Sequence, residues 1–584
     1  MKLLAFCCAV PTFALAAIAA VAQVTTSQYD NLRTGATLSE SILVPQNVNV
    51  KQFGRLGALK VDGAVYAQPL FIPSLEIPGK GTHDVLFVAT EHDSVYAFNA
   101  DRPDDPPLWH VSVLDKKRGD TAVSTRDVQC PFIQPEVGIT STPVIDLKTG
   151  TLYVLARTMV GHIFADSEYF QYLHALAITT GAEKLGGPKL IMASVPGRGA
   201  GAVNGRVRFD PLLENPRASL LLVNDTLYLT WASSCDRDPY HGWVMAYDPQ
   251  TLAQRAVLNV TPDGGQGGIW ASDTGPGADA NGDIYVPTGN GTFDASTGGR
   301  DYGDSVLKLA LQGSSIVVRD YFTPHDQAQL SDADADLGSS GPLLLPDQPA
   351  PHRHLLLQPT KGSMIYVIDR DRMGKFQSDG DAVVQRIRMR GGGYGAMAYW
   401  NGHVFFACSD DYLRDYTVEN GKLTLNTHSS TEFANPGATP SVSANGNKDA
   451  IVWAVATKTW NGSDQPAVLY AFNASKIDQP IYTSEQNSRR DRAAMATRFV
   501  IPIVVNGRVY FGARGEVEVY GLLKYRKGEK AEPINCRTVR NPETDDHYPM
   551  PGCMTYHRKQ KGSVFAWRRS VPALLSDGSQ TTYQ

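Results

Sequence analysis

Eight short apolar segments of similar sequence recur along the chain, each after a strand-like run and a tight turn. Examples are VYAFNAD at 95–101, VMAYDPQT at 244–251 and LYAFNAS at 469–475. The others lie at 173–181, 306–313, 365–371, 413–421 and 516–523, so that successive segments are 48 to 78 residues apart. A unit of four strands cannot bury its own faces, so this recurrence predicts units packed around one axis, which is a β-propeller.

The first and last units indicate how the ring closes. In the first unit, strand-like runs alternate with turns at 64–72, 84–90, 94–100 and 107–113. The last unit, 502–523, has no fourth strand after it, whereas the run at 52–61 has no hairpin partner of its own. We expect 52–61 to complete the last sheet, because closure removes exposed sheet edges. The prediction is an all-β, eight-bladed β-propeller of four-stranded antiparallel blades, or seven blades if one unit is misread.

The segments outside the repeats set the domain boundaries. Residues 1–22 resemble a secretory signal, with Lys2 at the start, an apolar stretch, and the small-residue cleavage site Ala20-Val21-Ala22. An uncleaved anchor is the alternative, since the apolar stretch is nearly long enough to span a bilayer. We expect a periplasmic or secreted protein with no membrane span after cleavage, divided into a lead-in at 23–51, a propeller at 52–523 and a basic, polar C-terminal extension at 524–584.

Five cysteines remain after removal of the signal, and an oxidising compartment favours pairing among them. Cys536 and Cys553 flank a short polar loop and are the favoured pair. Cys130 and Cys235 form a second candidate pair, because both lie in long insertions that could meet on one face. Cys408 follows an apolar strand and is expected to be a buried small hydrophobe. None has the spacing of a zinc site.

Charge and the ionisable residues give few further leads. A net charge of −5 argues against a nucleic-acid partner. The expected partner is a small molecule, a glycan or a cell-envelope protein, which are the partners that the hypotheses below imply. Polar hairpin turns, such as the one that contains Glu91 and His92, can line the funnel at a propeller axis. A histidine there acts as a general base or binds a substrate. A solvated polar turn is the simpler alternative. The candidates for the funnel are His92, Glu91, Arg157, His241 and Arg498.

Alternating aspartates occur in the segment at 331–336, SDADAD. Such carboxylates can hold a surface Ca²⁺. However, Leu343 stands where an EF-hand loop requires a glutamate, so the match to that motif is incomplete.

Three strings resemble the quinoprotein alcohol dehydrogenase-like superfamily of pyrroloquinoline-quinone (PQQ) type propellers. They are the lead-in at 29–56, GGIWASDTGPGADANGDIYVPTGNG at 267–291 and TKGSMIYVIDRDRMGK at 360–375. The resemblance covers about residues 28–523 and is greatest to a bacterial exported subgroup with strings similar to ATEHDSVYAF at 89–98 and GATPSVSANG at 437–446.

The resemblance implies PQQ and Ca²⁺ as cofactors. By position, Trp270 matches the aromatic floor under the quinone, and Asn290 matches the asparagine that ligates calcium. Lys361 matches a basic residue that touches the quinone oxygens. Each residue also has an ordinary structural interpretation: core packing for Trp270, a turn for Asn290 and a hairpin turn for Lys361.

Other features of the dehydrogenases are missing at the expected positions. The chain has no adjacent cysteines outside the signal to form the disulfide that covers the quinone, and the catalytic aspartate is replaced around 311–313. Glu168 is out of register for the calcium-binding glutamate, and no Cys-x-x-Cys-His haem motif occurs. The leading hypothesis is therefore a binding or scaffold protein, as the outer-membrane assembly lipoproteins exemplify. The alternatives are a PQQ- and Ca²⁺-dependent alcohol or sugar dehydrogenase and a polysaccharide lyase using His92.

Overall fold

The computed structural model describes residues 22–162, 165–457, 465–523, 538–540 and 547–549. The chain divides into two compact units, Met1–Leu523 and Lys524–Gln584. In the second unit, β38 (Thr538–Arg540) pairs antiparallel with β39 (His547–Pro549). Cys536, Cys553 and nearly all of the predicted signal at 1–22 lie outside the described residues, so that pairing and the signal stay predictions. Within the described ranges, no helix has both the length and the apolar character needed to cross a membrane.

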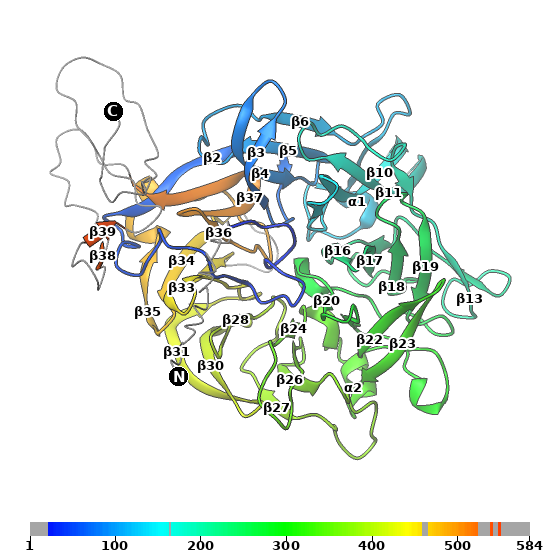
Figure 1. Ribbon diagram of the computed structural model, residues 1–584. Helices are drawn as coiled ribbons and strands as arrows, with labels where there is room; N and C mark the ends of the chain where they lie inside the picture. Colours follow the sequence, from blue (N-terminus) through cyan, green and yellow to red (C-terminus); the bar gives the residue numbers. More distant parts are fainter. Residues whose placement is uncertain (1–21, 163–164, 458–464, 524–537, 541–546, 550–584) are drawn as a thin grey trace, which may run out of the picture. The chain divides into compact units, whose positions relative to one another are not determined.

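The first unit consists of consecutive antiparallel sheets. In Figure 1 these sheets follow one another in chain order around a central region. The first sheet contains β3 (Leu70–Ile77), β4 (Gly81–Ala89), β5 (Ser94–Asn99) and β6 (Trp109–Ser112). The second contains β7 (Thr121–Ser124), β8 (Glu136–Val137), β9 (Val144–Asp146), β10 (Thr151–His162), β11 (Ala165–Ala177) and β12 (Lys189–Leu190). The third contains β15 (Glu214–Asn215), β16 (Leu221–Val223), β17 (Thr226–Ser233), β18 (Trp243–Tyr247) and β19 (Gln254–Asn259).

The next four sheets repeat this order. The fourth contains β20 (Gly277–Ala278), β21 (Ile284–Pro287), β22 (Val306–Gln312) and β23 (Ser315–Phe322). The fifth contains β24 (Leu343–Leu344), β25 (Leu355–Pro359), β26 (Met364–Asp369) and β27 (Gln385–Arg388). The sixth contains β28 (Ala398–Trp400), β29 (His403–Phe406), β30 (Asp411–Glu419) and β31 (Lys422–Phe433). The seventh contains β32 (Ser441–Asn445), β33 (Lys448–Ala456), β34 (Val468–Asn473) and β35 (Lys476–Thr483), with the lead-in strand β1 (Ala36–Thr37) parallel to β32.

The eighth sheet joins the two ends of the first unit. It contains β2 (Phe53–Ala64), β36 (Ile503–Val505) and β37 (Arg508–Leu522), and β2 runs antiparallel to β37 from Phe53 opposite Leu522. The predicted pairing of 52–61 with 502–523 is therefore confirmed. The remaining elements are short: β13 (Ser194–Pro196), β14 (Arg206–Arg208), α1 (Thr125–Val128), α2 (Gln327–Asp332), α3 (Ser488–Asp491), η1 (Ala271–Asp273), η2 (Ala295–Thr297), η3 (Leu337–Ser339) and η4 (Ser484–Asn487).

β37 folds back on itself near Gly515, which has a positive φ of 74°. The rings of Phe511 and Tyr520 are stacked with their centroids 5.7 Å apart. Fully extended chain between these two positions would separate them by about 30 Å. The chain of β37 therefore turns back on itself within the sheet formed by β2, β37 and β36.

The alanine of the repeated segment explains the recurrence. In each of four sheets it lies directly opposite an aromatic residue of the preceding strand, because a small side chain leaves room for a large one across the pair. All of these residues are buried. The pairs are Ala97 with Phe87, Ala175 with Tyr153, Ala246 with Tyr228, and Ala471 with Trp453.

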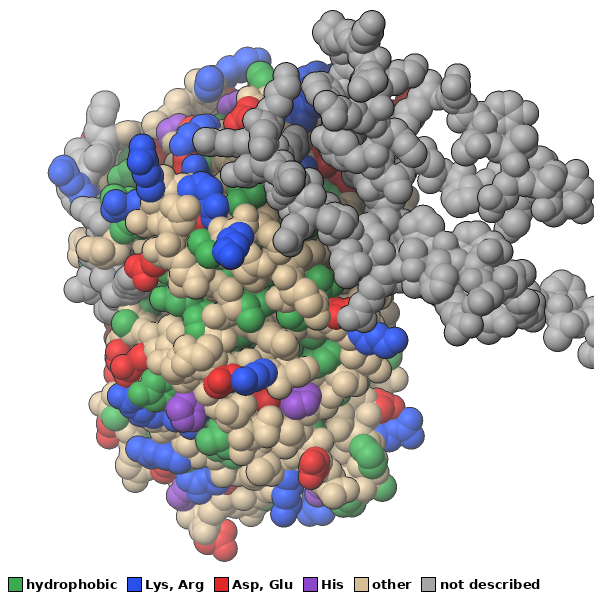
Figure 2. All heavy atoms as spheres, turned by 90° about the vertical axis from the view of Figure 1, so that its left-hand side faces the viewer, with side chains coloured by type: hydrophobic (Ala, Val, Ile, Leu, Met, Phe, Trp, Pro, Cys, Tyr) green, Lys and Arg blue, Asp and Glu red, His purple; other side chains and the backbone are tan. Residues whose placement is uncertain are grey.

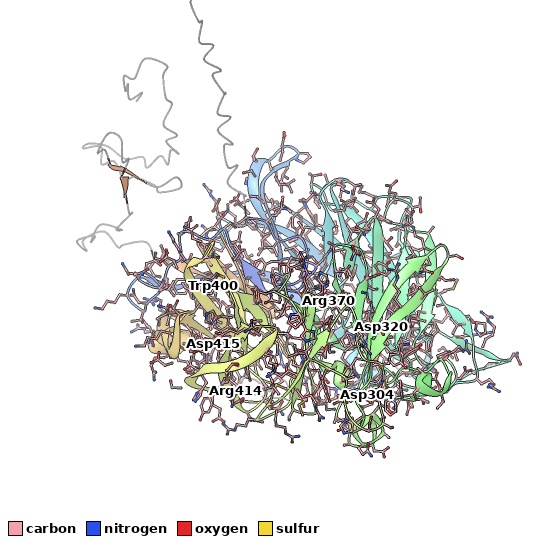
Figure 3. The ribbon with its side chains drawn as sticks, turned by 60° about the horizontal axis from the view of Figure 1, so that its bottom comes forward. Asp304, Asp320, Arg370, Trp400, Arg414 and Asp415 are labelled. Carbon is pink, nitrogen blue, oxygen red and sulfur yellow. A yellow bond between two sulfur atoms is a disulfide. The ribbon has the colours of Figure 1, made fainter. Side chains whose placement is uncertain are left out.

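Polar contacts also join neighbouring sheets. Arg370, labelled in Figure 3, directly follows β26 and lies 5.6 Å from the ring centroid of Tyr285 in the fourth sheet. Its guanidinium is 3.6 Å from the carboxylate of Asp279. The outer face shown in Figure 2 carries interspersed basic, acidic and apolar side chains.

Candidate functional site

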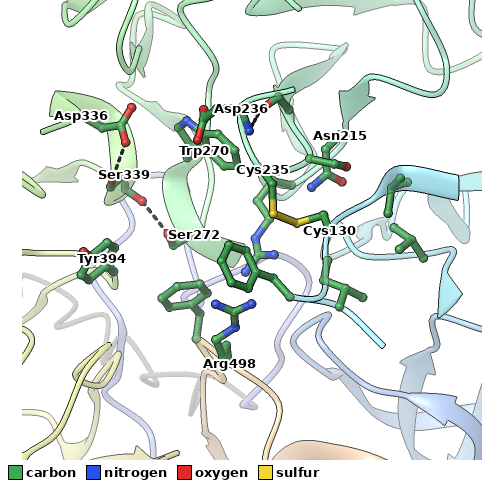
Figure 4. Close-up of a pocket in the computed structure, with 18 of the residues that line it drawn as sticks. Cys130, Asn215, Cys235, Asp236, Trp270, Ser272, Asp336, Ser339, Tyr394 and Arg498 are labelled. Atoms are coloured by element: carbon green, nitrogen blue, oxygen red, sulfur yellow. Dashed lines mark hydrogen bonds between the residues drawn. A yellow bond between two sulfur atoms is a disulfide. The ribbon is translucent and has the colours of Figure 1, made fainter. Parts of the chain in front are cut away.

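A pocket of about 730 Å³, partly open to solvent, lies where the inner ends of several sheets meet. We call it the central pocket, and Figure 4 shows its lining. Trp270 and Lys361, predicted from the sequence as cofactor contacts, both line it, and so does Arg498. The structure therefore brings together residues that are more than 200 positions apart in the chain.

The floor of the central pocket is built by the repeat itself. In five sheets, the residue that stands four or five positions before the first inner strand reaches the pocket. The same position in every unit leads toward the centre, because each unit enters its innermost strand from there. Of this set, only Arg498 was predicted from the sequence, although the shared position before the first inner strand could have indicated the others. The five residues are Arg217, Ser272, Ser339, Tyr394 and Arg498.

One side of the central pocket is acidic. Asp336 is buried, and its Oδ1 accepts a hydrogen bond from the backbone N–H of Asn290 at 2.9 Å. Lys361 Nζ lies 3.2 Å from Asp336 Oδ2 and 2.6 Å from Asp334 Oδ1. The Asn290 amide donates to Asp334 Oδ1 at 2.8 Å, while its own Oδ1 is buried and has no hydrogen-bond partner among the described residues. An unsatisfied buried carbonyl oxygen beside carboxylates is a ready ligand for a cation.

The proximity of these charged groups shifts the pKa values of Asp336 and Lys361. Burial raises the pKa of Asp336, and the neighbouring Lys361 only partly offsets that effect. Burial of the ammonium opposes its charge, but the carboxylates of Asp336 and Asp334 raise the pKa of Lys361 above its ordinary value. Lys361 is therefore a fixed positive charge at this side of the pocket.

Gly289 lets Trp270 and Asp336 approach each other. A Cβ added at Gly289 would lie 2.3 Å from Asp336 Oδ1 and 3.1 Å from Trp270 Cδ1. Only glycine leaves room for both side chains at this point of the Thr-Gly-Asn turn. The indole Nε1 of Trp270 is buried and has no partner in the described part of the chain.

Asp236 adds a further carboxylate at the mouth of the central pocket, where the residue is exposed. Its Oδ1 accepts a hydrogen bond from the hydroxyl of Tyr240 at 2.8 Å. Desolvation of the carboxyl and repulsion from Asp336 raise its pKa to about 6. Glu168, the out-of-register candidate for a calcium-binding glutamate, lies on β11, outside the pocket lining.

A disulfide between Cys130 and Cys235 also lines the central pocket, with the two Cα atoms 5.6 Å apart. The second candidate pair from the sequence is thus the one formed within the described residues. Cys130 lies in the 125–137 segment, which contains α1 and β8, and Cys235 lies between β17 and β18. Cys408 is a buried free thiol, as predicted.

Two guanidinium groups lie at the other side of the central pocket and are held against aromatic rings. Arg498 lies 4.0 Å from the ring centroid of Phe132, and Arg217 lies 5.0 Å from that of Phe499. Both arginines are buried. The central pocket therefore has an acidic side and a basic side joined by aromatic and apolar walls (Figure 4).

The other residues predicted for an axial funnel do not line the central pocket within the described chain. Glu91 is buried, and its Oε2 accepts from the backbone N–H of Gly138 at 2.8 Å. His92 contacts Glu136 through Nδ1 at 2.7 Å. Arg157 is buried and donates to the carbonyl of Leu212.

His241 is held in the structure by both ring nitrogens. Nδ1 lies 3.0 Å from Thr261 Oγ1, and Nε2 lies 2.9 Å from the carbonyl oxygen of Ala200. Burial lowers the pKa of His241, so the ring is neutral and fixed. This arrangement stabilises the fold and leaves no ring nitrogen for a substrate.

The alternating aspartates at 331–336 do not form the isolated surface loop that the sequence suggested. Asp334 is exposed, but Asp336 is buried and faces Asn290 and Lys361. The resemblance puts the dehydrogenase aspartate around 311–313, in β22 and the turn after it, whereas the structure supplies a carboxylate beside Asn290 from the turn before η3. The signal that could have found it is the Asp-Ala-Asp run itself.

Buried carboxyls make the stability of the protein depend on pH. Asp304, labelled in Figure 3, accepts a hydrogen bond from the Leu337 backbone N–H at 3.0 Å, and burial raises its pKa to about 7. The native state therefore holds a proton on Asp304 at pH values where the unfolded chain has lost it. We expect the free energy of unfolding to fall as the pH rises from about 4 to about 7.

Urea denaturation at a series of pH values measures this effect. Asp304→Asn should flatten the decline, because the asparagine keeps an oxygen for Leu337 and does not ionise. A wild-type protein whose stability rises steadily over the same pH range would contradict the prediction.

Comparison with solved structures shows what this fold is similar to. The quinohemoprotein alcohol dehydrogenase ADHIIG from Pseudomonas putida HK5 matches with 14% identity and a TM-score of 0.53, over 89% of this chain and 84% of that one. The corresponding enzyme from Comamonas testosteroni matches with 14% identity and a TM-score of 0.55, over 87% and 82%. A europium-containing methanol dehydrogenase matches with 12% identity and a TM-score of 0.51, over 86% and 98%. No protein-family model and no curated protein sequence matches the chain.

Proposed function

We propose that this chain, which has the propeller fold of the quinoprotein alcohol dehydrogenases, binds PQQ and a hard metal cation in the central pocket and oxidises an alcohol or a sugar. The observation that carries the proposal is that Trp270, Lys361 and the buried Asp336 line one side of the pocket, with Asn290 behind Asp336 and in contact with it. Trp270, Lys361 and Asn290 were predicted from the sequence, and Asp336 is the acid that the prediction lacked.

The residues present fit a hard cation such as Ca²⁺. Such ions take carboxylate and carbonyl oxygens as ligands. Asn290 Oδ1 is buried without a partner in the described chain, and Asp336 adjoins it. Asp236 interacts electrostatically with Asp336 from the pocket mouth. A cation ligated by these groups would favour the ionised carboxylates that burial alone disfavours.

The residues also fit a flat, anionic quinone. Trp270 offers an aromatic surface, and its buried Nε1 has a donor to spare among the described residues. Lys361 on the acidic side and the arginines 217 and 498 on the basic side offer positive charge for quinone oxygens and carboxylates. PQQ, when bound, supplies the acceptor for the electron pair that leaves the alcohol carbon.

A side chain of the protein would accept the proton that leaves the alcohol hydroxyl. Oxidation of an alcohol to a carbonyl compound removes two electrons and two protons, one of them from the hydroxyl. Asp336 would accept the hydroxyl proton, because it is a carboxylate in the pocket lining and burial raises its pKa. Asn290 and Lys361 hold Asp336 in place through the contacts given above.

The scaffold hypothesis rested on missing dehydrogenase features: a catalytic aspartate, a disulfide over the quinone, a calcium-binding glutamate in register and a haem motif. Asp336 and the Cys130–Cys235 disulfide line the central pocket, which supports an interpretation in which this chain fills the first two roles with other residues. The lyase hypothesis depended on His92, which contacts Glu136 outside the pocket lining. The dehydrogenase is therefore the proposal that the geometry supports best.

We further infer that the eight sheets are eight blades and that the β2–β37 pairing closes their ring. The predicted signal and the Cys130–Cys235 disulfide support a periplasmic or secreted location, because disulfides persist in oxidising compartments.

Reconstitution tests the proposed function directly. The purified full chain, incubated with PQQ and Ca²⁺, should show a red-shifted quinone absorbance and reduce an artificial dye when given a panel of alcohols and sugars. Trp270→Ala should weaken PQQ binding about tenfold by removing the stacking surface. Trp270→Phe, which keeps an aromatic ring, should recover most of that affinity.

The control is Trp400→Phe, a change in the sixth sheet away from the central pocket, which should bind PQQ like the wild type. Absence of any PQQ binding to the wild-type chain at micromolar concentrations would end the dehydrogenase proposal and restore the scaffold hypothesis.

A further inference from the structure

We infer that the Cys130–Cys235 disulfide is a positioning element for the Asp236 carboxylate, so that the affinity of the central pocket for a hard cation depends on this bond. The inference rests on the proposed function, since it assumes that Asp236 contributes to a cation site. It concerns a contact between two insertions that lie 105 residues apart in the chain.

The turn that carries Asp236 has an unfavourable backbone. Cys235 and Asp236 are consecutive non-glycine residues with positive φ values of 56° and 51°. L-residues with a Cβ avoid this left-handed region, and two in succession persist only where the surroundings hold them. The position of the Asp236 carboxylate at the pocket mouth therefore depends on a backbone conformation that is unfavourable without support from its surroundings.

The contacts of this turn show what holds it. The backbone N–H of Asp236 donates to Ser233 Oγ at 2.9 Å, and Tyr240 donates to the Asp236 carboxylate at 2.8 Å. Both partners belong to the same loop between β17 and β18 or to its edge. The only covalent tie from outside the third sheet, within the described chain, is the disulfide at Cys235.

The other end of the disulfide lies on a well-anchored segment. In the 125–137 segment, Cys130, Ile133 and Val137 are buried in one apolar cluster with Tyr66. Tyr66 also donates to the carbonyl of Phe132 at 3.1 Å. The disulfide thus ties a strained turn to a packed segment that lines the same pocket.

Breaking the disulfide should let the turn relax and withdraw the carboxylate. A dithiol such as dithiothreitol supplies two electrons and two protons, which give two cysteine thiols and the cyclic disulfide of the reductant. A hydrogen bond from Arg237 Nη1 to the carbonyl of Asp127, at 3.0 Å, also joins the turn to the segment and would remain after reduction. Loss of a group that orients a metal ligand typically weakens metal affinity about 10- to 100-fold.

Terbium binding measures this effect. Tb³⁺ is a hard cation that binds oxygen ligands as Ca²⁺ does, and excitation of a nearby tryptophan such as Trp270 sensitises its emission. The full chain, freed of metal by a chelator, is titrated with Tb³⁺ as the wild type, as Cys130→Ser/Cys235→Ser, and as the wild type after reduction with dithiothreitol. Circular dichroism at the same temperature establishes that each sample is folded.

We expect about 10- to 100-fold weaker Tb³⁺ binding in both disulfide-free samples. Two variants serve as controls and should bind like the wild type. Cys408→Ser removes the buried free thiol, which does not line the central pocket. Tyr169→Phe removes a hydrogen bond to Asp127 in the 125–137 segment but leaves the disulfide intact.

A double-mutant cycle separates positioning from general stability. Asp236→Asn should itself weaken Tb³⁺ binding, and in that background removal of the disulfide should have little further effect, because the carboxylate it positions is already gone. Equal Tb³⁺ affinity in the oxidised and disulfide-free proteins, or additive losses in the cycle, would overturn this inference alone. A wild-type protein that binds no Tb³⁺ would overturn the cation site of the proposed function and this inference with it.

Discussion

Asp336→Asn is expected to lower kcat/KM of the PQQ- and Ca²⁺-loaded protein about 100- to 10,000-fold, which is the usual contribution of a positioned general base. The substitution keeps the size of the side chain and an oxygen that can accept from the Asn290 backbone N–H, now 2.9 Å away. It removes the ability to take up the hydroxyl proton. Dye reduction by single alcohols, normalised to the amount of PQQ bound, gives the rate.

Asp334→Asn is the matched control. This exposed aspartate also contacts Lys361 and Asn290, yet it does not line the central pocket. We expect kcat/KM of the Asp334→Asn variant to stay within about tenfold of the wild type, because the substitution weakens only one contact between charged groups. If Asp336→Asn retained wild-type turnover at equal PQQ occupancy, another group would have to be the base.

The second large effect concerns stability. Phe53→Ala should lower the free energy of unfolding by about 3–5 kcal/mol, the range for a buried phenylalanine replaced by alanine. Phe53 opens β2 and is fully buried. Its ring contacts Trp453 and Tyr482 of the seventh sheet at centroid distances of 5.5 and 4.9 Å, and Tyr520 of the eighth at 6.3 Å.

Lys60→Ala lies on the same strand and provides the control. Lys60 is exposed and pairs with Glu516 on β37, so its loss should cost about 0–1 kcal/mol, as for other surface ion pairs. Urea denaturation of the two variants compares them directly. A Phe53→Ala variant no less stable than Lys60→Ala would mean that the lead-in strand contributes little to the fold.

The sheets were predictable from the sequence because their signals are local. Strand alternation, asparagine-glycine turns and the repeated alanine segment each depend on neighbouring residues. The pairing of β2 with the last sheet is not local, but it follows from counting strands, since one run and one sheet each lacked a partner. Trp270, Asn290 and Lys361 were found through position in a resembling string, and the structure gathers all three around Asp336.

What the sequence could not give was the distance between insertions. Asp336 lies in the turn that follows β23 and α2, so its position in the chain relative to Asn290 depends on the length of that connection. Cys130 and Cys235 are bonded because the second and third sheets are neighbours. The number of residues between the two cysteines does not indicate how close they lie in space. Glu91 and Arg157 are buried and do not line the central pocket, and a polar residue in a sequence gives no sign of whether it faces a cavity or is buried by its neighbours.

The pairing between β2 and β37 has a consequence for the order in which the chain acquires its structure. β2, which begins at Phe53, can pair only after Leu522 and the rest of β37 have been synthesised. Contacts between such distant residues carry a large entropic cost and form late, whereas each hairpin can form from adjacent segments. On the ribosome, the early strand would remain an unpaired edge until nearly all of Met1–Leu523 has emerged, so its docking would be among the last events of assembly.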